Sequence, residues 1–159
     1  MNSLLTTLPI LLPVAVAWVE KQEVLLLERG VPLNDTQVAD AKRVGVKEPG
    51  RIRLVPVDAL PQPENEDVMF VAQHIGFFGN RSVSLALGYA ICLLPEAWTE
   101  RTQLMHELVH ISQYERMGGI RPFLSVYLRE CIDPGYPFGA LEQEAILVAK
   151  DICRQAKQA

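Results

Sequence analysis

Residues 106–110 of this chain read HELVH, and they hold two of its three histidines. Residues four apart on an α-helix are rotated by only about 40° from each other, so both imidazoles would lie on one side, roughly one turn apart. His106 and His110 placed in this way suit two ligands of one metal ion. The pattern has this meaning only if the segment is helical, which makes it the strongest constraint on the fold.

The residues around the motif predict a single helix over 98–117. Leu104, Leu108 and Ile111 form an apolar stripe at helical spacing within it. A glycine pair at 118–119 supplies the end of the helix, because glycine readily adopts the left-handed conformation found there. The motif therefore lies inside a predicted helix. HExxH also occurs by chance, and the alternative is a helix with two half-exposed histidines.

A catalytic metal site needs a base and a further ligand, and glutamates are available for both. Glu107, between the histidines, can reach a water on the same metal and take its proton. Downstream, residues 140–149 read ALEQEAILVA and predict a second helix with Glu142 and Glu144 in its first turns. These two are about 200° apart on a helix, so only one can face the site. Alternatively, both are acids that favour a helix N-terminus.

HELVH followed by LEQEAILVA resembles the gluzincins, the HExxH zinc metallopeptidases whose third ligand is a glutamate on a later helix. The resemblance covers residues 82–149 and extends to small uncharacterised bacterial members. It implies a zincin-like fold and Zn²⁺ held by His106, His110 and Glu144, with Glu142 as the second choice. Val148 departs from the pattern, because larger gluzincins often place an aspartate there to brace a histidine ligand.

The function that this implies is hydrolysis of a peptide or protein by a zinc-activated water, with Glu107 as the base. Tyr136, in a turn just before the last helix, is the candidate donor to the oxyanion. Tyr89 and Tyr127 are alternatives, and Tyr136 could equally be a packing residue. Two other functions stay open: a catalytically silent zincin that binds peptides or proteins, and a zinc hydrolase of non-peptide amides or esters.

Composition limits the remaining possibilities. A chain of 159 residues is expected to form one domain, 1–159, with one proper core. The net charge of -4 and the lack of a basic cluster argue against nucleic-acid binding. The three cysteines show no CxxC pair, which favours buried reduced thiols and a cytoplasmic location. The oligomeric state stays open.

The N-terminal segment allows several interpretations. Residues 4–19 contain no charge, and Ala15-Val16-Ala17 resembles a signal-peptidase site. No lysine or arginine precedes Lys21, however, and two prolines interrupt a stretch that is short for a membrane span. Residues 14–29 instead predict an amphipathic helix that ends at Gly30. Within region 1–30 we expect a helix packed on the body; a signal or membrane anchor, or a dimer contact, are the alternatives.

The remaining pattern predicts an α+β fold that is mostly helical, with a small mixed or antiparallel sheet and a central HExxH helix. The strand predicted at 51–57 is expected at a sheet edge because of Pro56. Further helices are predicted at 35–44, 64–75 and 121–130, and further strands at 83–94.

Overall fold

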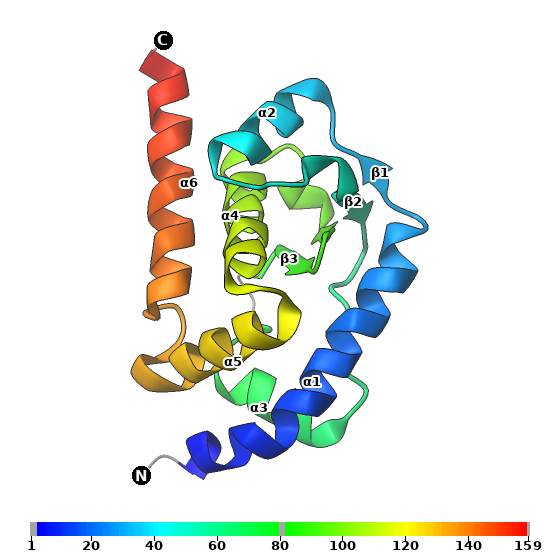
Figure 1. The fold of residues 1–159 in the computed structure, drawn as a ribbon, viewed down its shortest axis with the longest axis vertical. Coiled ribbons are helices and arrows are strands. Elements are labelled where there is room, and N and C mark those ends of the chain that lie inside the picture. Colours follow the sequence, from blue (N-terminus) through cyan, green and yellow to red (C-terminus); the bar gives the residue numbers. More distant parts are fainter. Residues whose placement is uncertain (1–2, 80–81, 159) are drawn as a thin grey trace.

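Helices enclose a small mixed sheet in the computed structural model, which describes residues 3–79 and 82–158 (Figure 1). This arrangement confirms the α+β class and the mostly helical content. The helices are α1 (Ser3–Leu27), α2 (Asp35–Arg43), α3 (Glu66–His74), α4 (Arg101–Met117), α5 (Ile120–Glu130) and α6 (Ala140–Gln158). The strands are β1 (Val31–Pro32), β2 (Arg53–Pro56), β3 (Ser84–Leu87) and β4 (Ala90–Leu93).

The sheet has the order β1-β2-β4-β3, so β3 lies at one edge. Strands β2 and β4 are parallel, and the other neighbouring pairs are antiparallel. The prediction of an edge position for the Pro56 strand is wrong, because β1 covers the outer side of β2. Only Arg53 and Leu54 pair with β1. Pro56 has no N–H to donate, but it lies beyond this short pairing. The hydrogen bonds between β1 and β2 are therefore not affected by it.

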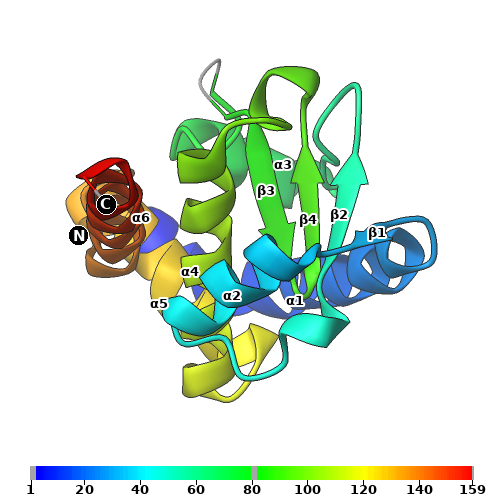
Figure 2. The ribbon, with the colours of Figure 1, turned by 90° about the horizontal axis from the view of Figure 1, so that it is seen from above.

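Successive residues of the strands face opposite sides of the sheet, and each side has its own apolar core. Ile91 and Leu93 of β4 pack on the side of α4, together with Met105 and Leu108. Leu85, Leu87 and Cys92 pack on the other side with Val19 and Leu26 of α1. Figure 2 shows α4 beside β3 and α1 crossing the opposite side of the strands. The sheet therefore holds these two helices at fixed positions.

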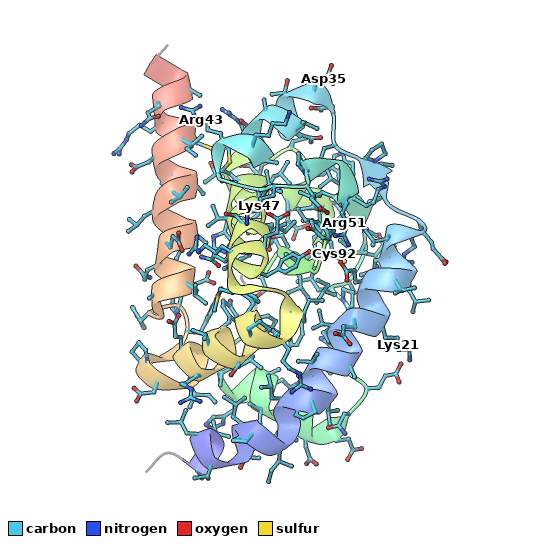
Figure 3. The ribbon with its side chains drawn as sticks, in the orientation of Figure 1. Lys21, Asp35, Arg43, Lys47, Arg51 and Cys92 are labelled. Atoms are coloured by element: carbon cyan, nitrogen blue, oxygen red, sulfur yellow. The ribbon has the colours of Figure 1, made fainter. Side chains whose placement is uncertain are left out.

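Helix α6 returns alongside α4 and closes the core on that side (Figure 1). Ala149 and Ile152 of α6 belong to the same apolar cluster as Leu108. Figure 3 shows Arg43 of α2 near α6, where its guanidinium donates to Gln155 Oε1 at 2.9 Å. The motif helix is thus covered on one flank by the C-terminal helix.

Helix α1 is longer than predicted, since it begins at Ser3 and continues through Pro9 and Pro13. Both prolines are exposed, and each leaves the carbonyl four residues before it without its usual helical donor. The helix is long and apolar enough to cross a membrane by length and composition, and 22% of its most apolar window is buried. Core helices of soluble proteins and signal sequences meet the same criterion.

A specific contact fixes α1 to the β3–β4 hairpin. Glu23 Oε1 accepts a hydrogen bond from the backbone N–H of Tyr89 at 2.8 Å. Gly88 precedes it in the turn with a φ of 62°, and a Cβ there would lie 2.2 Å from the Glu23 carboxylate. The turn therefore needs glycine both for its conformation and for the approach of α1. Lys21, by contrast, points away from the body (Figure 3).

The packing of α1 can be tested with two adjacent leucines. Leu26 is 1% exposed, whereas Leu25 is 50% exposed. Leu26→Ala should lower the free energy of unfolding by about 2–5 kcal/mol, because it leaves a cavity between α1 and the sheet. Leu25→Ala is the matched control and should change it by less than about 0.5 kcal/mol. Denaturant unfolding measures both, and equal effects would contradict the packed position of α1.

Candidate metal centre

Three side chains from α4 and α6 converge at one point. The Nε2 atoms of His106 and His110 lie 3.0 Å apart. Glu142 Oε1 lies 3.1 Å from His106 Nε2, and its Oε2 lies 3.2 Å from His110 Nε2. His110 and Glu142 are buried and His106 is partly buried. This cluster could hold a metal ion.

The separations fit a tetrahedral ion of zinc size. Zinc binds histidine nitrogen and carboxylate oxygen at about 2.0–2.2 Å, which places tetrahedral ligand atoms about 3.4 Å apart. The distances of 3.0–3.2 Å among His106, His110 and Glu142 are within a few tenths of an ångström of that value. Two imidazoles and one carboxylate form a donor set typical of catalytic zinc. The residues present therefore fit such an ion.

Gln113 orients the buried histidine. Its Oε1 lies 2.8 Å from His110 Nδ1, so the Nδ1–H donates to it and Nε2 is the ring nitrogen that faces the cluster. The amide Nε2 of Gln113 donates to the carbonyl of Leu141 at 2.8 Å and to Glu144 at 2.9 Å. Gln113 is fully buried, so α4 and α6 are joined through one side chain directly behind the histidine.

In the cluster, the His110 imidazole and the Glu142 carboxylate each stabilise the charged form of the other. Burial opposes a charged imidazole, yet the hydrogen bond with Glu142 and the nearby Glu107 raise the pKa of His110. Burial likewise opposes a charged carboxylate, but the two histidines lower the pKa of Glu142 well below its usual range. Glu142 is therefore ionised at neutral pH and available as an anionic ligand.

Tyr127 of α5 holds the same carboxylate. Its hydroxyl donates to Glu142 Oε2 at 2.8 Å, and both groups are buried. Burial and the charge of Glu142 raise the pKa of Tyr127 well above its usual value, so the hydroxyl keeps its proton. Tyr127 was an alternative for the oxyanion donor, but here its hydrogen is committed to the candidate ligand.

Glu142 takes the position that the sequence assigned first to Glu144. The Glu144 carboxylate faces Arg116, with its Oε1 2.9 Å from Nη1, and it also accepts from Gln113. That ion pair turns Glu144 to the outer side of the α4–α6 contact, away from the two histidines. In the structure, the carboxylate beside the two histidines is therefore that of Glu142, the second choice, and not that of Glu144, the first. Glu144 instead accepts a hydrogen bond from Gln113, which contacts His110.

Glu107 is buried beside the cluster and is held by the edge strand. The Ser84 hydroxyl donates to its Oε1 at 2.5 Å, and the Ala86 N–H donates to its Oε2 at 2.9 Å. Gln103 donates to the Ser84 oxygen at 2.6 Å. The carboxylate of the predicted base is thus oriented by β3.

Tyr136 lines the same cavity as His106, Glu107 and Glu142, and it is 36% exposed. Burial, followed by the charges of Glu142 and Glu107, raises the pKa of Tyr136 to about 12. The neutral hydroxyl is therefore available as a donor at neutral pH. Tyr89 lies elsewhere, because its hydroxyl donates to Glu115 at 2.9 Å.

The third histidine and the three cysteines stay outside the cluster. His74 stacks on Phe70 of α3, with ring centroids 5.9 Å apart. All three cysteines are buried with free thiols, and Cys92 lies within the sheet core (Figure 3). Burial raises the pKa of Cys131 to about 12, which disfavours the thiolate that metals bind. Val148, where a bracing aspartate was missing, packs against the core.

Comparison with known proteins finds no relative of this chain. No protein-family model, curated protein or solved structure matches the chain. The functional argument therefore depends on the residues of the site.

Two site residues, Ser84 and Gln113, were not singled out from the sequence, and neither was the hydrogen bond from Tyr127 to Glu142. Only Gln113 has a sequence signal, because it follows His110 by three residues and His106 by seven. Those spacings place it on the same face of the helix as the motif. Ser84 and Tyr127 reach the site through the packing of β3 and α5, which spacing does not reveal.

Replacing the two glutamates of α6 tests which of them is the ligand. Glu142→Gln should weaken zinc binding by more than about 100-fold, because it removes the anionic donor from the cluster. Glu144→Gln, the matched control, should cause a smaller loss of about 10- to 100-fold or less, as expected for a partner outside the ligand set. Competition with a coloured chelator measures both affinities. A larger loss for Glu144→Gln would show that it is the ligand.

Gln113→Leu tests the orientation of His110. The leucine fills similar space but cannot accept the Nδ1 hydrogen, so zinc affinity should fall about 10- to 100-fold. Gln73→Leu, on the exposed surface of α3, is the control and should leave affinity unchanged. Unchanged zinc affinity in Gln113→Leu, with the fold intact by circular dichroism, would show that Gln113 is not needed to orient His110.

Proposed function

We propose that the protein is a zinc-dependent metallopeptidase of gluzincin type with a zincin-like fold. The observation that supports this most directly is the convergence of His106, His110 and Glu142, with Glu107 beside them. A binding site that only held a metal would have no need of Glu107. The intact HExxH pattern on α4 and the carboxylate from a later helix agree with the donor set of the gluzincins.

The proposed reaction is hydrolysis of a peptide bond. Zinc held by the three ligands would supply Lewis-acid catalysis. It would also lower the pKa of water, so that water loses a proton readily at neutral pH and can act as a nucleophile. Glu107 accepts the proton of the attacking water and later passes it to the leaving amine. Tyr136 donates a hydrogen bond to the developing oxyanion, with its high pKa keeping the proton in place.

Strand β3 is the proposed platform for the substrate backbone. It lies at the sheet edge, and its residues 84–87 line the same cavity as His106 and Glu107. An extended peptide could add to this edge through main-chain hydrogen bonds, which give affinity with little sequence preference. β4 is interior to the sheet and cannot serve in this way.

A second candidate is a silent zincin that binds peptides without cleaving them. The observation in its favour is that both oxygens of Glu107 already accept hydrogen bonds from Ser84 and Ala86. A carboxylate with both oxygens held by the protein in this way would have a structural role. Buried free thiols support the proposal of a cytoplasmic location for either function.

Glu107→Gln separates the two functions. In a peptidase the variant should keep zinc and fold but lose about 10²–10⁴-fold in turnover, the range for a general base. Glu96→Gln, an exposed glutamate before α4, is the control and should retain full activity. Cleavage of casein or a peptide library, with zinc content measured in parallel, provides the readout.

Parent activity should vanish with a chelator and return with zinc. Zinc-loaded parent protein that binds peptides but cleaves none of them would favour the silent module. Protein that folds but takes up no zinc would contradict both functions.

A further inference from the structure

A second, open hollow lies where β2 and β4 end, and it is called the strand-end hollow below. Its volume is about 720 Å³, and its wall includes Pro56 from the end of β2 and Leu93 from the end of β4. Among the described residues, none of those that line it also lines the cavity with His106 and His110. The strand-end hollow is therefore separate from the candidate metal centre.

The course of the chain explains why a hollow forms at this edge of the sheet. Strands β2 and β4 are parallel, so their carboxyl ends lie at the same edge (Figure 2). After β2, Val57 and Leu60 pack on the α1 side of the sheet, whereas after β4 Ala97 joins the core on the α4 side. The chain thus leaves the two strands towards opposite faces. Ligands commonly bind in the crevice that such a divergence opens outside the ends of parallel strands.

Two opposite charges in the strand-end hollow have no partner. Arg29 and Asp58 both line it. Within the described part of the chain, neither side chain makes a hydrogen bond or an ion pair, and they do not pair with each other. Burial raises the pKa of the Cys92 thiol in β4 to about 12, and the charge of Arg29 opposes this rise, so the guanidinium lies close to the strand. A ligand with both charges would find a partner for each.

The indole of Trp98 adds an apolar surface to the same wall. Trp98 lines the strand-end hollow and is 43% exposed. A tryptophan ring that stays accessible can pack against an aliphatic or aromatic group of a ligand. The hollow therefore offers a cation, an anion and an apolar face to one small molecule.

We propose that the strand-end hollow binds a small zwitterion of the amino-acid type, with its carboxylate on Arg29, its ammonium group on Asp58 and its apolar side chain on Trp98. A simple anion would use Arg29 alone, and a sugar would have no charge for either group. The site depends neither on the metal centre nor on peptide hydrolysis. L-Leucine is the probe for the tests that follow.

Fluorescence of Trp98 provides the first test. The chain has two tryptophans, so Trp18→Phe leaves Trp98 as the only one. This protein is kept metal-free with a chelator and titrated with L-leucine, with N-acetyl-L-leucine, which lacks the ammonium group, and with L-leucinamide, which lacks the carboxylate. A saturable change is expected, with leucine at least about threefold tighter than either analogue, as for the loss of one exposed ion pair. Calorimetry on the parent chain makes the same comparison if Trp18→Phe fails to fold.

Several results of this titration would overturn the proposal. Equal affinity for leucine and N-acetyl-leucine would indicate a site for simple anions, and equal affinity for leucine and leucinamide a site for simple cations. Binding of methyl glucoside in the absence of leucine binding would indicate a carbohydrate site. Binding of none of these compounds would show that the hollow is not a ligand site.

Two charge-neutralising variants test the assigned contacts. Arg29→Gln should reduce the affinity for leucine to that for leucinamide and leave leucinamide binding unchanged. Asp58→Asn should reduce it to that for N-acetyl-leucine and leave N-acetyl-leucine binding unchanged. Arg121→Gln, at an exposed position of α5 outside the hollow, is the control and should bind leucine as the parent does. Equal weakening of all three ligands in both variants would contradict the contacts.

A variant of the metal cluster separates this site from the proposed function. Glu142→Gln, which is expected to lose zinc, should bind leucine with the affinity of the parent. Loss of leucine binding in Glu142→Gln, with the fold intact by circular dichroism, would place the ligand at the metal cluster and overturn the proposal. Leucine binding to a protein that takes up no zinc would contradict only the proposed peptidase.

Discussion

The amide of Gln113 holds together the part of the molecule on which the candidate site depends. It accepts from His110 on its own helix and donates to Leu141 and Glu144 on α6. With both ends of the amide bonded, the position of α6 along α4 is linked to the orientation of a histidine. The same position brings Glu142 next to both imidazoles. The candidate metal site, made from two helices, thus relies on one buried, fully bonded side chain that is not itself a candidate ligand.

Helix α1 has two structural roles. It packs on the sheet through Val19 and Leu26 and is held to the hairpin by Glu23. Its first half also forms a wall of the cavity that contains the candidate site. A mostly apolar sequence suits both roles, because the inner face contacts the core and the cavity that Glu142 also lines. Loss of α1 would therefore affect both stability and the shape of the cavity.

Much of the fold could be predicted from local patterns. The motif helix ends at Gly118, whose φ of 92° is the left-handed conformation expected of a terminal glycine. Asn34 caps α2 with both hydrogen bonds of a capping box at 2.9 Å. These features depend on residues close in sequence. The edge position predicted from Pro56 was wrong, because the two-residue partner β1 is too short to have a sequence signal.

For the candidate site, too, local sequence patterns predict only part of the arrangement. His106, Glu107 and His110 are placed by one helix, so their spacing alone indicates that they act together. The choice between Glu142 and Glu144 depends instead on the register of α6 against α4. That register follows from the path of residues 131–139 and from the pairing of Glu144 with Arg116. Neither is encoded in the distance between the motifs, and the same is true of Tyr127.

The N–H of Ala86 lies where two acceptors would compete for it. It points outward from the free edge of β3, where an added strand would seek a donor, and it already serves Glu107. One N–H cannot serve two acceptors at full strength. A peptide carbonyl that takes this hydrogen therefore displaces one oxygen of the carboxylate. In the proposed peptidase, arrival of a substrate strand and release of one Glu107 oxygen from Ala86 would be a single exchange of acceptors.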